Sequence, residues 1–241
     1  ATDGHTFLMT SSSFTVGAAL RAGQLPYDVL RDFAPVSLFA ESANGVFVHP
    51  GLAAAGIAEF VALARSQPGA LTMGSPGNGT TAHVTQEYFK LRTGTELVHV
   101  PYRGSGALLP DLLGGQVVSA IDNLPPYAEH VQAGRLRLLA MTTARPWPAA
   151  PGVPTLAATV APGFDVVTWF GLLAPADTPA PVLEAMSRLC GEALGDATVA
   201  ARIRQVGAEP APSTPAAFGE LLRQELARWT EVVRVSGARL D

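Results

Sequence analysis

The stretch Leu71-Thr-Met-Gly-Ser-Pro-Gly-Asn-Gly-Thr80 decides the fold class of this chain. Its apolar start is typical of a short buried strand, and Gly77 and Gly79 permit backbone angles that are closed to other residues. Thr80 or Thr81 is a suitable N-cap for the amphipathic helix that the following residues indicate. The stretch therefore predicts a strand, a glycine-rich loop and a helix in succession.

Two interpretations of this loop stay open at the level of sequence. A glycine-rich loop before a helix directs backbone N–H groups and the positive end of the helix dipole at one point, which suits a carboxylate or a phosphate. The same residues are equally typical of a tight turn that binds nothing, since glycine-rich loops between strands and helices are common in α/β proteins.

Strand, loop and helix alternate along much of the remaining chain. Such alternation predicts an α/β architecture with a largely parallel sheet. Asp28 is expected to cap a helix after the turn Leu25-Pro-Tyr-Asp28, and Pro125-Pro126 to open another. Further strands are expected at residues 5–10, 33–40, 45–49, 96–100, 116–121, 136–142 and 164–173, and helices at residues 57–64, 107–113, 179–194, 196–206 and 215–235.

Polar side chains collect where the predicted strands end. Ligands of α/β sheets bind beyond the carboxyl ends of the strands, so this placement predicts a small-molecule site. The polar residues at these ends are Ser11, Ser75, Asn78, Thr80, Tyr102, Ser105, Asp122 and Asn123.

The composition bounds the class of protein. A length of 241 residues suits one large domain or two small ones, and 48% hydrophobic against 15% charged residues allows a substantial core. The net charge of −4 and the absence of basic clusters argue against nucleic acid, and no apolar run approaches the roughly 20 residues that span a bilayer. The single cysteine, Cys190, cannot form an internal disulfide and is expected to be a buried structural thiol.

The residues that could carry catalysis or hold a cofactor form no specific motif. No Walker A sequence and no nucleophile elbow is present, and no cofactor is predicted. A hydrolase or lyase that uses Ser75 or Ser105 with His83 and Asp122 stays an alternative, although His83 as a structural histidine and Asp122 as an acceptor for loop N–H groups are favoured. The histidines lack the spacing of a zinc site; they are His5, His49, His83, His99 and His130.

A series of longer motifs makes the sequence specific. In chain order they are Leu25-Pro-Tyr-Asp28, Arg31-Asp-Phe-Ala-Pro-Val36, Gly74-Ser-Pro-Gly-Asn-Gly-Thr-Thr-Ala-His83, Val98-His-Val-Pro-Tyr-Arg-Gly-Ser-Gly106, Asp111-Leu-Leu-Gly-Gly-Gln116, Asp122-Asn123 and Trp169-Phe-Gly-Leu-Leu-Ala-Pro175. This series resembles the Bug family, the extracytoplasmic solute receptors of tripartite tricarboxylate transporters. The resemblance covers nearly the whole chain.

The resemblance implies a type II periplasmic binding protein fold and no enzymatic activity. Two α/β lobes, residues 1–46 with 169–241 and residues 47–168, would be joined by hinge crossings near residues 44–48 and 167–170. They would close on a small carboxylate, which is a di- or tricarboxylate, an aromatic carboxylate or an acidic amino acid in the family. The periplasmic receptor would deliver this ligand to the membrane components of a transporter without inserting into the membrane itself. A sensor subunit that presents the closed form to a signalling partner stays an alternative.

The resemblance also implies where the ligand binds. The binding loops would be Ser11-Ser12 in lobe one and residues 75–80 in lobe two, with Tyr102 and Trp169 shaping the cleft wall. Family members begin with a further βαβ segment that has no match in this sequence, so lobe one is expected to lack strands and to leave part of its core uncovered. The ligand-binding residues carried over are Ser11, Ser12, Ser75, Gly77, Asn78, Gly79, Thr80, Tyr102, Asp122, Asn123 and Trp169.

Overall fold

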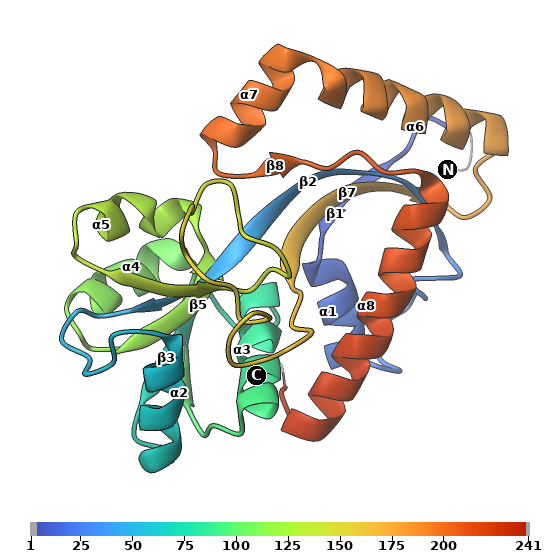
Figure 1. Ribbon diagram of the computed structural model, residues 1–241. Helices are drawn as coiled ribbons and strands as arrows, with labels where there is room; N and C mark the ends of the chain where they lie inside the picture. The colour runs from blue at the N-terminus through green and yellow to red at the C-terminus, as the bar shows by residue number, and fades with distance from the viewer. Residues whose placement is uncertain (1–3, 240–241) are drawn as a thin grey trace. The chain divides into compact units, whose positions relative to one another are not determined.

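The structure of this chain is a computed structural model that describes residues 4–239. The described residues form two units (Figure 1). Unit 1 consists of residues 4–42 and Thr168–Arg234, and unit 2 of Ala43–Val167 and residues 235–239. That these units act as lobes about a hinge stays a prediction.

Unit 1 is a small antiparallel sheet with helices. Leu8 of the first strand lies opposite Leu173, and Ala40 lies opposite Pro210. The elements of this unit are β1 (Leu8–Ser11), α1 (Ser13–Leu20), the first part of β2 (Phe33–Val48), β7 (Val167–Pro175), α6 (Ala180–Gly195), α7 (Ala197–Gln205), β8 (Glu209–Pro210) and α8 (Pro215–Ser236).

Side chains on the two faces of this sheet pack against different helices. Leu38 and Trp169 pack with Phe218 and Leu222 of α8 in a buried cluster. Because side chains alternate along a strand, the neighbouring residues face the other way. They line an apolar surface groove with residues of α6 and α7, and Met9 there is 65% exposed. The groove is lined by Met9, Phe39, Ala40, Phe170, Leu194, Ile203, Val206 and Ala208.

Unit 2 contains the strand, glycine-rich loop and helix that residues 71–91 predict. In its core, Phe47 stacks on Tyr127 and packs with Leu108 and Leu112. The elements are the second part of β2, α2 (Ile57–Ser66), β3 (Thr72–Ser75), α3 (Thr81–Thr93), β4 (Val98–Pro101), α4 (Ser105–Leu113), β5 (Ser119–Asn123), the 3-10 turn η1 (Pro125–Tyr127), α5 (Ala128–Gln132) and β6 (Arg137–Met141).

The strand directions correct one prediction. β3 runs parallel to β4 and to β5, but β2 runs antiparallel to β5, β6 and β8, and β1 runs antiparallel to β7. The largely parallel sheet is therefore wrong outside β3, β4 and β5. Alternation along the sequence sets the type of each element, whereas direction depends on which remote strands become neighbours.

The long strand β2 corrects a second prediction. Residues 33–40 and 45–49 were expected as two strands, but Phe33–Val48 forms one. The polar residues between them read as a break, yet Glu41 pairs with Glu209 and Asn44 pairs with Asn123. Partners far along the chain keep these residues extended.

Two smaller expectations concern the single cysteine and membrane-spanning helices. Cys190 is buried, as predicted. Within residues 4–239, no helix combines the length and the apolar character needed to cross a membrane.

Candidate functional site

The carboxyl ends of the parallel strands meet at one edge of unit 2. Ser75 at the end of β3 lies opposite Pro101 at the end of β4, and Gly74 lies opposite Ala120 of β5. The register therefore brings Ser75, Tyr102 and the pair Asp122-Asn123 to the same edge of the sheet. This is the edge at which α/β sheets bind ligands.

The glycine-rich loop at this edge is held by Thr80, which of the two predicted candidates, Thr80 and Thr81, is the one that caps α3. The hydroxyl of Thr80 accepts a hydrogen bond from the His83 N–H (3.3 Å) and donates one to the Gly77 carbonyl (2.7 Å). Gly77 has a φ of +142°, and a Cβ atom there would lie 2.9 Å from the Tyr102 carbonyl oxygen. Only glycine therefore fits this turn.

Several loop N–H groups are bonded within the loop. Gly77 donates to Ser75 Oγ and Gly79 donates to His83 Nδ1, each at 3.2 Å, while Thr80 donates to the Gly77 carbonyl at 3.3 Å. An anion would compete with these contacts in this conformation. What the loop offers without rearrangement is the first turn of α3, where N–H groups lack acceptors in the helix itself.

Ser75 has a partner that the sequence did not reveal. Its Oγ lies 2.7 Å from His99 Nε2, and the His99 ring stacks on His83 with 4.3 Å between centroids. Burial, with smaller contributions from His83 and Lys90, lowers the pKa of His99 to about 4, so the imidazole is neutral at pH 7. His99 reaches Ser75 through the pairing of β4 with β3, in which it lies opposite Met73, so no local signal in the sequence marks it.

This arrangement does not make Ser75 a nucleophile. The side chain is fully buried, and its oxygen already accepts the Gly77 N–H. His83, the expected base, is bonded to Gly79 and stacked on His99 rather than paired with Ser75. The hydrogen bonds of the site fit a loop that is held in shape.

Asp122 is a buried acceptor. The Tyr127 hydroxyl donates to it at 2.8 Å, the Asn123 N–H donates at 2.7 Å, and Ser105 adds a side-chain hydrogen bond. Burial raises the pKa of Asp122, and these donors oppose the rise. Its acceptance of a backbone N–H agrees with the favoured sequence interpretation.

Tyr102 is anchored in a similar way. Its hydroxyl donates to Asp111 Oδ2 at 2.8 Å. Burial, followed by this hydrogen bond, raises the pKa of Tyr102 to about 12. The side chain is half-buried at the strand edge, with its polar end directed at α4.

The predicted binding residues of unit 1 lie partly in its core. Ser11 ends β1 opposite Phe170 and is half-buried, whereas Ser12 is fully buried and its N–H donates to the Trp169 carbonyl at 3.0 Å. Trp169 is also fully buried, and its indole N–H donates to Glu225 Oε2 at 2.6 Å. Trp169 is thus a core side chain of unit 1, although the resemblance suggested a wall residue.

Asn44 is a polar residue that the sequence interpretation placed only at a hinge crossing. It lies on β2 directly opposite Asn123 and is fully buried. Within residues 4–239, neither its Nδ2 nor its Oδ1 has a hydrogen-bond partner, and the Oδ1 of Asn123 is also buried without one.

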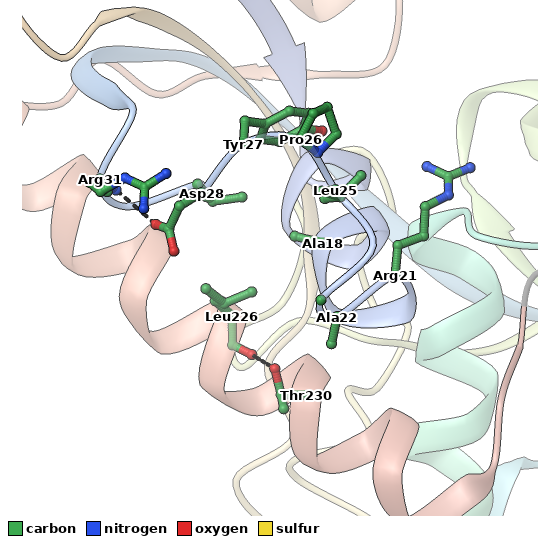
Figure 2. A pocket seen from close by; sticks show the side chains of 12 residues that line it. Ala18, Arg21, Ala22, Leu25, Pro26, Tyr27, Asp28, Arg31, Leu226 and Thr230 are labelled. Atoms are coloured by element: carbon green, nitrogen blue, oxygen red, sulfur yellow. Dashed lines mark hydrogen bonds between the residues drawn. The ribbon is translucent and has the colours of Figure 1, made fainter.

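Unit 1 also has a surface pocket of about 470 Å³, which lies between α8 and residues 18–31 (Figure 2). Arg21 and Arg31 lie on opposite sides of it, and Leu226 and Thr230 of α8 contribute to its lining. None of the predicted ligand-binding residues lines this pocket. Its lining side chains are mostly exposed.

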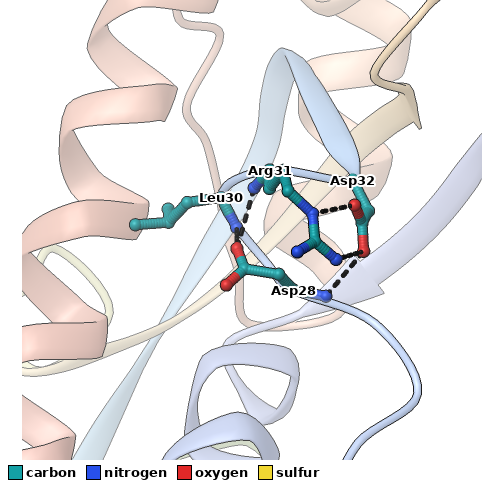
Figure 3. Close-up of polar contacts among 4 residues, drawn as sticks. All are labelled: Asp28, Leu30, Arg31 and Asp32. Atoms are coloured by element: carbon teal, nitrogen blue, oxygen red, sulfur yellow. Dashed lines mark hydrogen bonds and ion pairs between the residues drawn. The ribbon is translucent and has the colours of Figure 1, made fainter.

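The turn beside this pocket corrects the expectation for Asp28. Its Oδ1 accepts the N–H groups of Leu30 (2.9 Å) and Arg31 (2.8 Å), but no helix follows (Figure 3). Asp28 therefore caps a turn. Arg31 pairs with Asp32 through two hydrogen bonds, which are the largest cause of the lowering of the Asp32 pKa to about 2.

Within the described part of the chain, no three His, Cys, Asp or Glu side chains gather as a metal site would require. The candidate site combines hydroxyl, amide and imidazole groups, the carboxyl group of Asp122 and the N-terminus of α3.

Known proteins resemble this chain over its whole length. Protein BugT of Bordetella pertussis is 35% identical over 242 residues, which cover 100% of this chain and 74% of BugT. A solved structure described as a periplasmic transporter is 36% identical, with a TM-score of 0.85, and covers 100% of this chain and 81% of its own.

Two similar structures contain a carboxylate. Rpa4515 of R. palustris, solved with adipate, is 34% identical with a TM-score of 0.84, over 100% of this chain and 81% of its own. MatC of Rhodopseudomonas palustris, with bound malate, is 26% identical with a TM-score of 0.79, over 97% of this chain and 80% of its own. The model of the family described as "Tripartite tricarboxylate transporter family receptor" matches residues 1–238. The chain therefore belongs to the TctC family of tripartite tricarboxylate transporter receptors, which is a family of solute-binding proteins and not of enzymes.

Proposed function

We propose that this receptor binds a small carboxylate, with linear dicarboxylates such as adipate and malate as the first candidates. Support comes from the similar proteins that were solved with these two compounds. The chain carries a net charge of −4, so attraction of an anion has to come from local groups. The carboxyl edge of β3, β4 and β5 supplies such groups.

The single observation that carries this proposal is the junction between β3 and α3. Thr80 and the glycines of residues 75–80 place the first turn of a long helix at the edge of the parallel strands. N–H groups at a helix start and the helix dipole favour a carboxylate. The predicted binding residues of unit 2 contain no arginine or lysine, so hydrogen bonds rather than an ion pair would hold the ligand.

We further propose a mechanism of delivery. Units 1 and 2 would act as lobes that close on the ligand, and contacts to both would stabilise the closed state. The closed receptor would pass its ligand to the membrane components of a transporter from the periplasm. The family description and the periplasmic transporter among the similar structures support this placement.

A thermal-unfolding screen tests the proposal. The purified chain is heated with adipate, malate, citrate, glutamate and benzoate, and with adipamide as the uncharged control. A true ligand at about 100 times its Kd adds about 2.7 kcal/mol to the free energy of unfolding, or about 5–10 °C in Tm for a chain of this size. We expect the diacids to raise Tm and adipamide to leave it unchanged.

Site variants then locate the binding. Asn78→Ala removes a predicted ligand contact and is expected to weaken binding, whereas Thr230→Val changes an exposed hydroxyl on α8 and should leave the Kd unchanged. No rise in Tm with any acid of the panel would overturn the carboxylate proposal. Equal Kd values for Asn78→Ala and Thr230→Val would remove the Asn78 side chain from the predicted ligand contacts.

A further inference from the structure

Two side-chain amides in unit 2 lie side by side without enough hydrogen-bond partners. Asn44 of β2 and Asn123 of β5 are directly opposite each other. Asn44 is fully buried with both its Nδ2 and its Oδ1 unpaired among residues 4–239, and the Oδ1 of Asn123 is buried and unpaired as well. Buried polar atoms nearly always have partners in native proteins, because water no longer satisfies them. In native proteins an ordered water or a bound ligand completes amides of this kind.

The register places the amide pair on a defined face of the sheet. Side chains that lie opposite each other share a face, as do side chains two residues apart. Asn123 thus shares a face with Ser119, and Ser119 lies opposite Met73 on β3, two residues before Ser75. The amide pair and Ser75 are on one face.

The same face is the one that α3 covers. His99 of β4 lies opposite Met73, and its ring stacks on His83 of α3. Asn44 and Asn123 also lie at the edge where β5 ends, which is the edge where β3 gives way to the glycine-rich loop and α3. The unpaired amides and the first turn of α3 therefore belong to the same corner of unit 2.

We infer that Asn44 is a ligand-binding residue of this receptor. Its Nδ2 donates a hydrogen bond to a carboxylate oxygen of the ligand, directly or through one ordered water, with Asn123 beside it. This inference rests on the proposed function and deepens it. A buried neutral amide suits the task, because it binds an anion through a hydrogen bond without the cost of burying an unpaired charge in the empty receptor.

The variant Asn44→Leu separates a ligand contact from a structural role. Leucine has the same branched shape and no polar atom, so it removes the unsatisfied amide from the empty receptor. We expect the Tm of the empty receptor to rise by about 2–4 °C. The Kd for adipate or malate, measured by titration calorimetry, should increase about 10- to 100-fold, since a hydrogen bond to a charged group is lost.

A matched control is available in unit 1. Thr178 is buried, and its Oγ1 is likewise unpaired among the described residues, but it is not part of the candidate site. Thr178→Val should raise Tm in the same way and leave the Kd unchanged. Asn44→Ala repeats the affinity measurement should leucine prove too large to fold, with circular dichroism to verify the structure.

The outcomes separate this inference from the proposed function. A wild-type chain that binds no carboxylate overturns both. A wild-type chain that binds adipate or malate, with Asn44→Leu or Asn44→Ala binding it equally well, overturns the role of Asn44 alone. A lower Tm for Asn44→Leu, with unchanged affinity, would show that the amide is paired inside the protein and would likewise refute the inference.

Discussion

Glu225 brings a carboxyl group into the core of unit 1. Its Oε2 accepts a hydrogen bond from the Trp169 indole N–H at 2.6 Å, and it shares the Thr15 hydroxyl with the Ser12 carbonyl, each 2.9 Å from that hydroxyl. Burial raises the pKa of Glu225, and Trp169, Thr15, Arg228 and Trp229 oppose this rise. A single acceptor thus joins α8 to β7 and to α1. A buried acceptor of this kind is favourable only while its donors remain.

Thr15→Val tests this contact at the scale of one residue. Valine keeps the shape of threonine but cannot donate, so we expect the free energy of unfolding to fall by about 1–2 kcal/mol. Urea unfolding gives this value, with an unchanged slope as a check on two-state behaviour. The control is Thr230→Val on α8, whose hydroxyl is exposed and where a change within about 0.5 kcal/mol is expected. Equal stability of the two variants would contradict the importance of the Glu225 contact.

At the scale of secondary-structure elements, the junction of β3 and α3 depends on a glycine with positive φ and on a helix cap. The Tyr102 carbonyl that approaches Gly77 is fixed, because the N–H of Tyr102 donates to the Ser75 carbonyl at 3.0 Å. The cap by Thr80 closes the other side of the loop. The loop shape therefore follows from backbone geometry and one hydroxyl.

Gly77→Ala is expected to destabilise unit 2 by about 1–3 kcal/mol, because alanine is strained at a φ of +142° and its Cβ meets the Tyr102 carbonyl. Gly106→Ala is the matched control. Gly106 lies within α4, and a Cβ there meets no atom within 4 Å, so this variant should gain about 0.5–1 kcal/mol. Thermal unfolding of the two variants should shift Tm in opposite directions. A destabilised Gly106→Ala would contradict this account.

The cap is tested by a pair of substitutions at one position. Thr80→Ala removes the acceptor for the His83 N–H and should cost about 1 kcal/mol in the free energy of unfolding. Thr80→Asn keeps a side-chain oxygen at the N-cap and should retain most of the stability. Chemical denaturation of both variants measures the difference. If both lose the same stability, the cap is not the role of Thr80.

At the scale of the whole molecule, buried titratable groups set how stability depends on pH. The pKa values of Asp122 and Glu225 are raised, so the folded state stays protonated at these groups to a higher pH than the unfolded state does. Their contribution to the free energy of unfolding is therefore fully present at low pH and is lost as pH rises through the folded pKa. His99 acts in the opposite direction. Its pKa is lowered from an ordinary 6.5 to about 4, so stability is lost as pH falls from 6.5 to 4, where only the unfolded state takes up the proton.

His99→Asn isolates this contribution. Asparagine can still hydrogen-bond the Ser75 hydroxyl but does not titrate. Urea unfolding from pH 7 to pH 4 gives the unfolding free energy of the wild type and of the variant. Below pH 6.5, the wild type should steadily lose stability relative to the variant. A difference that stays constant over this range would show that His99 is not the group responsible.

The sequence by itself determined the type of most elements, a threonine cap at residue 80 or 81, and the family. These follow from local causes: apolar periodicity, the angles open to glycine, and a hydroxyl three residues from its N–H partner. The polar edge around residues 75–80 and Asp122-Asn123 was also predictable, because the ends of parallel strands meet.

Only the tertiary structure decided the partners of those residues. That Ser75 pairs with His99, that Trp169 is a core side chain and that Asn44 lies opposite Asn123 all depend on which distant segments become neighbours. Strand direction and the continuity of β2 depend on the same long-range pairing. The physical reason is that side-chain type and local propensity are written along the chain, whereas burial and hydrogen-bond satisfaction arise only when remote segments pack together.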